Sequence, residues 1–153
     1  MREAKGRPVI GTLALQGDFA AHTAAMERLG ADGRLVRKIA QLEGLDGLII
    51  PGGESTTLIK LMDVFDLWDP LRAWIEAGRP TFGTCAGAIL LAAEVRNPEQ
   101  KSFGLIDITV ERNGYGRQVD SFEASGTFRH APQEECQIEM VFIRAPRIVR
   151  AGA

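Results

Sequence analysis

The sequence is poor in cysteine and histidine. Its 153 residues contain two cysteines and two histidines, and the cysteines do not have the C-x-x-C spacing of redox and zinc motifs. We therefore expect neither a disulfide framework nor a metal site. No segment approaches the roughly 18 apolar residues of a membrane helix, and the polar leader "MREAKGRP" (residues 1–8) has no apolar stretch of signal-peptide kind behind it. We expect a cytoplasmic protein that has no membrane partner.

An excess of charge of one sign is also missing. The formal net charge is -2, with 25% charged and 45% hydrophobic residues, which is the composition of an ordinary globular protein. This balance argues against a nucleic-acid partner. The sequence has neither the lysine of a phosphate-binding P-loop nor a G-x-G-x-x-G pattern. No cofactor is therefore expected, and the length favours a single domain, residues 1–153.

Apolar runs and helix-like patterns alternate in the first two thirds of the chain. Mostly apolar runs that end at glycines occur in "VIGTLALQG" (residues 9–17), in "LDGLIIPGG" (45–53) and at the entry to "FGTCAG" (82–87). Between them, residues 18–30, 55–65 and 69–78 have helical patterns. Their expected end residues are Asp18, Ser55 and Asp69 as N-caps, and Gly30 and Gly78 at the carboxyl ends.

This alternation predicts an α/β fold in three layers, with a central, mostly parallel sheet and helices on both faces. The pattern changes beyond about residue 104. Three further segments look like strands joined by turns, namely "GLIDITVERN" (104–113), "RQVDSFEASGTF" (117–128) and "IEMVFIRAP" (138–146). The second half should therefore be a mixed or antiparallel extension of the sheet.

Cys85 lies where an expected strand turns into an expected helix, in "FGTCAGAILLAA" (residues 82–93). Such a turn points one side chain out of the carboxyl end of a sheet and places backbone N–H groups beside it. These donors favour both a thiolate and a developing oxyanion, so the position suits a nucleophile. The ordinary alternative is a cysteine packed as a small hydrophobe. For Cys136 in "QEECQIEM" we expect no chemical role.

Two glycine-containing loops, "PGGES" (residues 51–55) and "GTCAG" (83–87), fall at strand ends on the sheet edge where ligands bind in such folds. Glycines let the two loops approach each other closely. The backbone N–H groups of Gly53 and Ala86 could then hold the oxyanion that forms when Cys85 attacks a carbonyl group.

Five segments together resemble one family: "LALQG", "LIIPGGESTT", "FGTCAG", "VERNGYGRQVDSFE" and "VFIRAP". They are similar to the glutaminase subunit of pyridoxal 5′-phosphate synthase, a class I (triad) glutamine amidotransferase of flavodoxin-like fold. The resemblance extends from about Val9 to Val149. It implies that L-glutamine is hydrolysed to L-glutamate and ammonia through a thioester on Cys85. It also implies that ammonia passes to a synthase subunit, within a large hetero-oligomer that makes the vitamin B6 cofactor.

The resemblance also implies which residues contact the glutamine. They would be Gly53, Glu54, Ser55, Arg112, Ile143 and Arg144. Gln16, at the end of the first strand, would lie near the oxyanion hole and the partner surface. Without the resemblance, the two arginines would be read as ordinary solvated charges.

The sequence departs from the family in one respect. Members continue past the equivalent of Ala153 and carry there a His-x-Glu pair, whose histidine activates the cysteine. Here His22 lies in the first expected helix and His130 in the loop-like "RHAPQ", and neither is followed two residues later by glutamate. We expect both to be ordinary polar residues. These 153 residues alone are therefore expected to lack glutaminase turnover.

Two other functions stay open from the sequence. One is a cysteine hydrolase or deglycase like those of the DJ-1/PfpI group, which place an acid near the cysteine from the end of the first strand. Gln16 and Asp18 occupy that region here. The other is a non-catalytic binding subunit that occupies a synthase surface without releasing ammonia, because the histidine and glutamate of the triad are missing.

Overall fold

A parallel four-stranded sheet forms the centre of the molecule. The computed structural model describes residues 6–132 and 134–152, so the first five residues of the polar leader lie outside it. The strands are β1 (Val9–Leu13), β2 (Asp32–Val36), β3 (Gly47–Ile50) and β4 (Thr81–Gly83). They lie in the order β2-β1-β3-β4, and every neighbouring pair is parallel.

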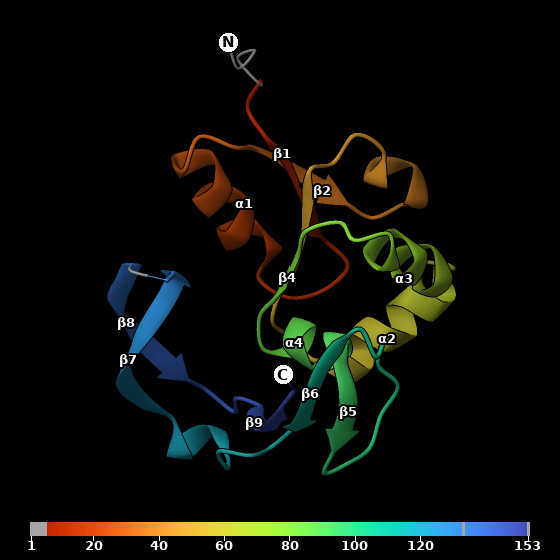
Figure 1. Ribbon diagram of the computed structural model, residues 1–153. Helices are drawn as coiled ribbons and strands as arrows, with labels where there is room; N and C mark the ends of the chain where they lie inside the picture. Colours follow the sequence, from red (N-terminus) through yellow and green to blue (C-terminus); the bar gives the residue numbers. More distant parts are fainter. Residues whose placement is uncertain (1–5, 133, 153) are drawn as a thin grey trace.

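Helices connect these strands and cover both faces of the sheet. They are α1 (Phe19–Arg28), α2 (Ser55–Val64), α3 (Trp68–Glu76) and α4 (Ala86–Leu91), with a short 3₁₀ turn η1 (Ile39–Leu42) before β3. Figure 1 shows α1 on one side of the sheet and α2 and α3 on the other. This arrangement confirms the predicted α/β class with a central parallel sheet.

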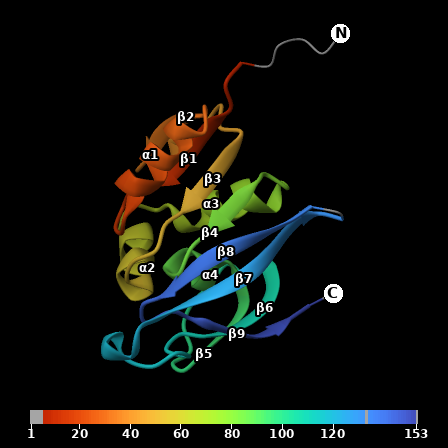
Figure 2. The same cartoon turned by 90° about the vertical axis from the view of Figure 1, so that its left-hand side faces the viewer.

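The second half of the chain adds two smaller sheets. Strand β5 (Ala92–Arg96) pairs in parallel with β6 (Ile106–Glu111), which pairs antiparallel with β9 (Arg147–Ala151). After a 3₁₀ turn η2 (Gln118–Asp120), strands β7 (Phe122–Ala131) and β8 (Glu134–Phe142) pair antiparallel as a two-stranded hairpin. This long hairpin stands to the left of β4 and α4 in Figure 1 and passes in front of α4 in the view of Figure 2. The second half therefore has the predicted mixed and antiparallel pairing, but its strands form separate sheets and do not extend the central one.

Several predicted boundaries were wrong. The helix expected over residues 86–93 ends at Leu91, because the next residues pair with β6 as strand β5. The strand expected over residues 138–146 ends at Phe142, and Arg144 has a φ of 47°, which extended chain does not adopt. His130, expected in a loop, belongs to β7.

The helix caps agree with the sequence only in part. The side chain of Asp18 accepts a hydrogen bond from the Ala21 N–H at 3.2 Å, so it caps α1 as predicted. Helices α2 and α3 instead begin one residue and two residues earlier than predicted, with Glu54 and Leu67 as their N-caps. Ser55 does not cap because its hydroxyl donates a hydrogen bond to Gln100.

The main hydrophobic core lies between the four-stranded sheet and its helices. The fully buried side chains include Leu13, Val36, Leu48, Ile50, Leu58, Met62 and Leu71. Trp68 and Phe103 stack beside them, with ring centroids 4.4 Å apart. Within the described ranges, no helix is long and apolar enough to cross a membrane, and no three His, Cys, Asp or Glu side chains could hold a metal ion.

Candidate active site

Cys85 occupies a strained turn between β4 and α4. Its backbone has φ 46° and ψ -105°, a conformation that costs free energy for any residue with a Cβ atom. Hydrogen bonds hold the turn from both sides: the Thr84 N–H donates to the Ile50 carbonyl at 3.1 Å, and the Gly87 N–H donates to the Thr84 carbonyl at 2.8 Å. A Cβ atom at residue 87 would collide with the Ile50 carbonyl oxygen, so only glycine lets α4 pack this close to β3. The cysteine is exposed to solvent.

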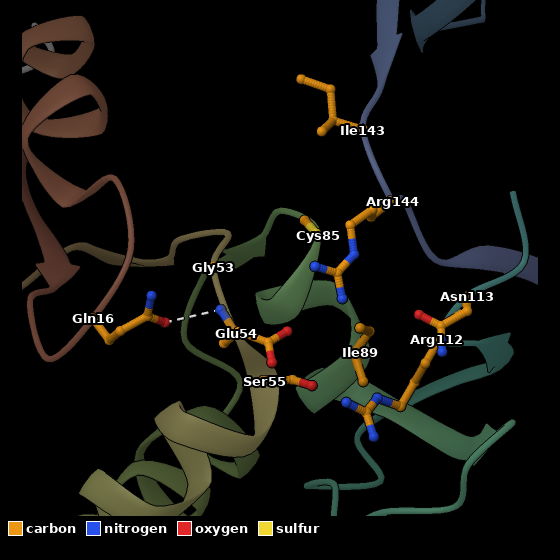
Figure 3. Close-up of a pocket in the computed structure, with 10 residues that line it drawn as sticks. All are labelled: Gln16, Gly53, Glu54, Ser55, Cys85, Ile89, Arg112, Asn113, Ile143 and Arg144. Atoms are coloured by element: carbon orange, nitrogen blue, oxygen red, sulfur yellow. Dashed lines mark hydrogen bonds between the residues drawn. The ribbon is translucent and has the colours of Figure 1, made fainter. Parts of the chain in front are cut away.

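The loop after β3 lies against this turn. A Cβ atom on Gly52 would lie 3.2 Å from the Cβ of Cys85. On its other side, Gln16 Oε1 accepts a hydrogen bond from the Glu54 N–H at 2.9 Å, which connects the end of β1 to the loop (Figure 3). Among the hydrogen bonds of the described residues, none uses the N–H of Gly53 or of Ala86. The described residues therefore leave both N–H groups without a partner, although Ala86 itself is fully buried.

A cavity of about 420 Å³ opens in front of Cys85. Its lining residues come from the segments that follow β1, β3, β4, β6 and β8 and from helices α2 and α4: Gln16, Gly53, Glu54, Ser55, Cys85, Ile89, Arg112, Asn113, Ile143 and Arg144. In Figure 3 the Arg144 side chain extends toward Cys85 and Glu54, Arg112 approaches from another side, and Ile143 lies apart from the others.

The structure thus brings together the residues that the sequence suggested. Every predicted site residue except Ala86 lines the cavity, and Ala86 is fully buried directly behind Cys85. The roles of these residues stay predictions. The sequence reasoning missed Ile89 and Asn113. Ile89 follows Cys85 by four residues on a helix and Asn113 follows Arg112 directly, so helical spacing and adjacency were the available signals.

The cavity has charges of both signs that are not paired with any other described residue. Within the described part of the chain, no ion pair or side-chain hydrogen bond uses Glu54, Arg112 or Arg144. Ser55 is nearly fully buried, and its Oγ donates to Gln100 Oε1 at 2.9 Å. That bond uses the hydroxyl proton, so the Ser55 oxygen presents only lone pairs to other partners.

The two histidines differ in their relation to the site. His22, on α1, places Nε2 3.2 Å from Thr84 Oγ1, so it reaches the residue before the cysteine. The backbone of His130 belongs to β7, and its side chain lies outside the described atoms. Asp18, which a DJ-1-like mechanism would direct at the cysteine, uses its carboxylate to cap α1.

Comparison with known proteins gives close relatives over nearly the whole chain. The pyridoxal 5′-phosphate synthase subunit PdxT of Nocardia farcinica is 53% identical over 151 residues, which are 97% of this chain and 66% of that protein. The protein of the same name from Thermosipho africanus is 50% identical over 143 residues, which are 94% of this chain and 74% of that protein. The chain thus spans about two thirds to three quarters of the length of these curated relatives.

Solved structures and a family model agree with these relatives. A crystal structure of a glutamine amidotransferase matches with a TM-score of 0.81 and 48% identity, covering 94% of this chain and 75% of that one. A putative GMP synthase protein from Thermoplasma acidophilum shares the fold, with 17% identity and a TM-score of 0.62 over 97% of this chain and 70% of that one. The model of the SNO glutamine amidotransferase family matches residues 12–153. The chain therefore belongs to the SNO glutamine amidotransferase family.

Proposed function

We propose that this chain is the glutaminase subunit of a pyridoxal 5′-phosphate synthase. It would hydrolyse L-glutamine to L-glutamate and ammonia and supply the ammonia to its synthase partner. The relatives that are about half identical to it are named as subunits of that synthase. The observation that carries the proposal is the placement of Cys85, in a strained turn that faces a cavity with unpaired charges of both signs.

The charges in the cavity match a free amino acid. Glutamine carries one carboxylate and one ammonium group at neutral pH. The guanidinium groups of Arg112 and Arg144 are suited to the carboxylate, because arginine can form two parallel charge-assisted hydrogen bonds with it. The carboxylate of Glu54 and the lone pairs of Ser55 Oγ are acceptors for the ammonium group. These contacts leave the side-chain amide of glutamine to approach Cys85.

The reaction would then proceed by covalent catalysis. The thiolate of Cys85 attacks the amide carbon, and the carbonyl oxygen becomes an oxyanion that accepts hydrogen bonds from the N–H groups of Gly53 and Ala86. Collapse of this intermediate breaks the C–N bond, and the leaving nitrogen takes up a proton to depart as ammonia. Water attacks the resulting thioester, which releases glutamate and returns the thiol.

The proton transfers need a base beside the sulfur. His22 contacts Thr84 Oγ1, and no hydrogen bond of the described residues joins a histidine to Cys85. A polypeptide of these 153 residues is therefore expected to show no ammonia release above background, even with its synthase partner present. Such a protein could still bind the synthase, which is the second candidate function.

Labelling with the glutamine analogue 6-diazo-5-oxo-norleucine tests the proposal. The analogue should modify Cys85, because this thiol faces the charged cavity, and peptide mapping by mass spectrometry identifies the modified residue. Cys136 is an internal control because it is also exposed but lies on β8. L-glutamine should protect Cys85 from the label, and D-glutamine should protect it less. Label on Cys136, or none on Cys85, would contradict the proposal.

A turnover assay separates the two candidate functions. Ammonia release is measured for the 153-residue polypeptide together with the synthase, and the Cys85→Ala variant serves as the control. Release that Cys85→Ala abolishes would show that these residues contain a working base, and His22 would be the next residue to substitute. Binding to the synthase without release, combined with labelling of Cys85, would support a glutamine site that is not sufficient for turnover.

A further inference from the structure

The contact between His22 and Thr84 connects α1 to the turn that holds Cys85. His22 Nε2 and Thr84 Oγ1 are 3.2 Å apart in a partly buried position, although the residues are 62 positions apart in sequence. Thr84 immediately precedes the cysteine. Its hydroxyl also lies close to the loop after β3, because a Cβ atom on Gly52 would be 3.8 Å from Thr84 Oγ1. The side chain of Thr84 therefore sits between α1 and the loop that carries Gly53.

The strained conformation of Cys85 needs such support. A residue with a Cβ atom keeps a φ of 46° only when its surroundings fix the chain on both sides. The carbonyl and N–H groups of Thr84 are already fixed, by Gly87 and Ile50 respectively. These bonds hold the backbone of Thr84, whereas its side chain is held by His22. Helix α1, which carries His22, lies on the face of the sheet opposite to α2 and α3 (Figure 1). The histidine thus contacts this turn from the α1 side.

We infer that His22 is a positioning residue for the nucleophile, acting through the hydroxyl group of Thr84. The inference rests on the proposed function only in taking Cys85 as the nucleophile. His22 does not exchange a proton with the sulfur in this arrangement. Instead, its hydrogen bond keeps Thr84 in place, and Thr84 keeps the Cys85 side chain directed into the cavity. Losing the bond lets the turn relax and lowers the reactivity of the thiol.

Alkylation of Cys85 by iodoacetamide is the direct measurement. Iodoacetamide resembles glutamine only in its amide group and reacts with any accessible thiol, so its rate reports on the turn whether or not the chain uses glutamine. The rate constants at Cys85 and Cys136 are determined in the same sample by peptide mass spectrometry. Thr84→Val keeps the shape of the side chain but removes the hydroxyl. We expect it to slow the alkylation of Cys85 about three- to tenfold, the range that one net hydrogen bond accounts for. The rate at Cys136 should stay the same.

Conservative and double variants distinguish a positioning role from general packing. Thr84→Ser keeps the hydroxyl and should restore most of the rate, and His22→Gln, which keeps a donor and an acceptor, should restore part of it. His22→Leu should be as slow as Thr84→Val. The double variant should be no slower than either single one, because both remove the same bond. Thermal unfolding of each variant identifies any that fail to fold. If His22→Leu does not fold, the comparison of Thr84→Val with Thr84→Ser still tests whether the hydroxyl group positions Cys85.

Two results would overturn the inference. One is a Cys85 alkylation rate in Thr84→Val equal to that of the unsubstituted protein. The other is a double variant whose slowing equals the product of the two single effects, because His22 and Thr84 would then act independently. The diazo-ketone labelling of the proposed function has a separate outcome. If the label does not modify Cys85 but Thr84→Val still slows its alkylation by iodoacetamide, the glutamine site is rejected and the positioning role of His22 stands.

Discussion

The segments that follow the four-stranded sheet and the β7–β8 hairpin line the same cavity, but the sheet and the hairpin are built differently. Leu13 and Ile50 of the sheet are 0% exposed, whereas Phe128 and Val141 of the hairpin are 51% and 63% exposed. The packed half provides Cys85 and the N–H groups of Gly53 and Ala86 that we propose as oxyanion donors. The arginines that would hold the substrate lie in the segments that follow β6 and β8, next to the hairpin. The turn that holds Cys85 therefore adjoins the buried sheet, whereas Arg144 follows the exposed hairpin.

Truncation of core side chains should show this difference most strongly. Leu48 in β3 is 1% exposed, and Leu48→Ala is expected to lower the free energy of unfolding by about 2–5 kcal/mol because it leaves a cavity in the core. Val141→Ala, in the hairpin, should change it by less than about 0.5 kcal/mol. Urea unfolding followed by circular dichroism measures both. Equal losses would mean that the hairpin is as tightly packed as the sheet.

Adding a methyl group in each region makes a second comparison. In Gly87→Ala the new Cβ would meet the Ile50 carbonyl oxygen, which the backbone of β3 holds in place, and we expect a loss of about 3 kcal/mol. In Gly126→Ala the new Cβ would meet the flexible end of Met140, at 2.7 Å from its Cε. That side chain can move, so the free energy of unfolding should hardly change. A tolerated Gly87→Ala would show that α4 can shift away from β3.

Removal of an arginine should affect substrate use and leave folding unchanged. Arg112→Ala would delete the charge-assisted contact that we propose between Arg112 and glutamine. The expected loss is about 1.5–3 kcal/mol, or one to two decades in labelling efficiency by the diazo ketone. The unfolding midpoint should stay the same, because Arg112 has no ion-pair partner in the described residues. Arg117→Ala is the control, as its guanidinium pairs with Asp120 and lies outside the cavity that Cys85 faces. Unchanged labelling in Arg112→Ala would make this arginine an ordinary surface charge.

The smallest effect is expected at the β6–β9 pair. The hydrogen bond from Arg150 and the charge of its guanidinium hold the pKa of Asp107 below its usual value. A lowered carboxylate pKa in the folded state stabilises the protein above the unfolded-state pKa of about 4, and the contribution is lost as the pH falls through the folded-state value. Asp107→Asn should therefore flatten the decrease in stability below about pH 4. Parallel pH profiles of the two proteins would argue against this contribution.

The sequence predicted the packed half better than the lightly packed half, for a physical reason. Parallel strands buried on both faces read as apolar runs, so β1 and β3 were recognisable. Strand β9 was missed because all five of its residues are exposed and no apolar pattern marks them. Strand β5 was missed because it begins at Ala92 within an alanine- and leucine-rich run, where pairing with β6 overrides helix propensity.

The sequence indicated which residues belong to the candidate site, but not which of their side chains contact each other. Cys85 and the glycine loops could be placed because strand ends meet at one edge of a parallel sheet. Arg112 and Arg144 have no such local signal and came from the family resemblance. The approach of His22 to Thr84 depends on how α1 packs, and no spacing in the sequence encodes a contact between residues 62 positions apart.

The two-part construction of the cavity also suggests where random mutagenesis would be productive. Residues 112–119 and 143–146 include the arginines at the edge of the cavity and are called the charged rim here. A library that varies them would not add or remove atoms in the buried sheet. A library over residues 47–53 or 83–91 would mostly return unfolded clones, because close backbone contacts and buried side chains fill those segments. Selection for new amide substrates should therefore begin at the rim and keep the turn at Cys85 constant.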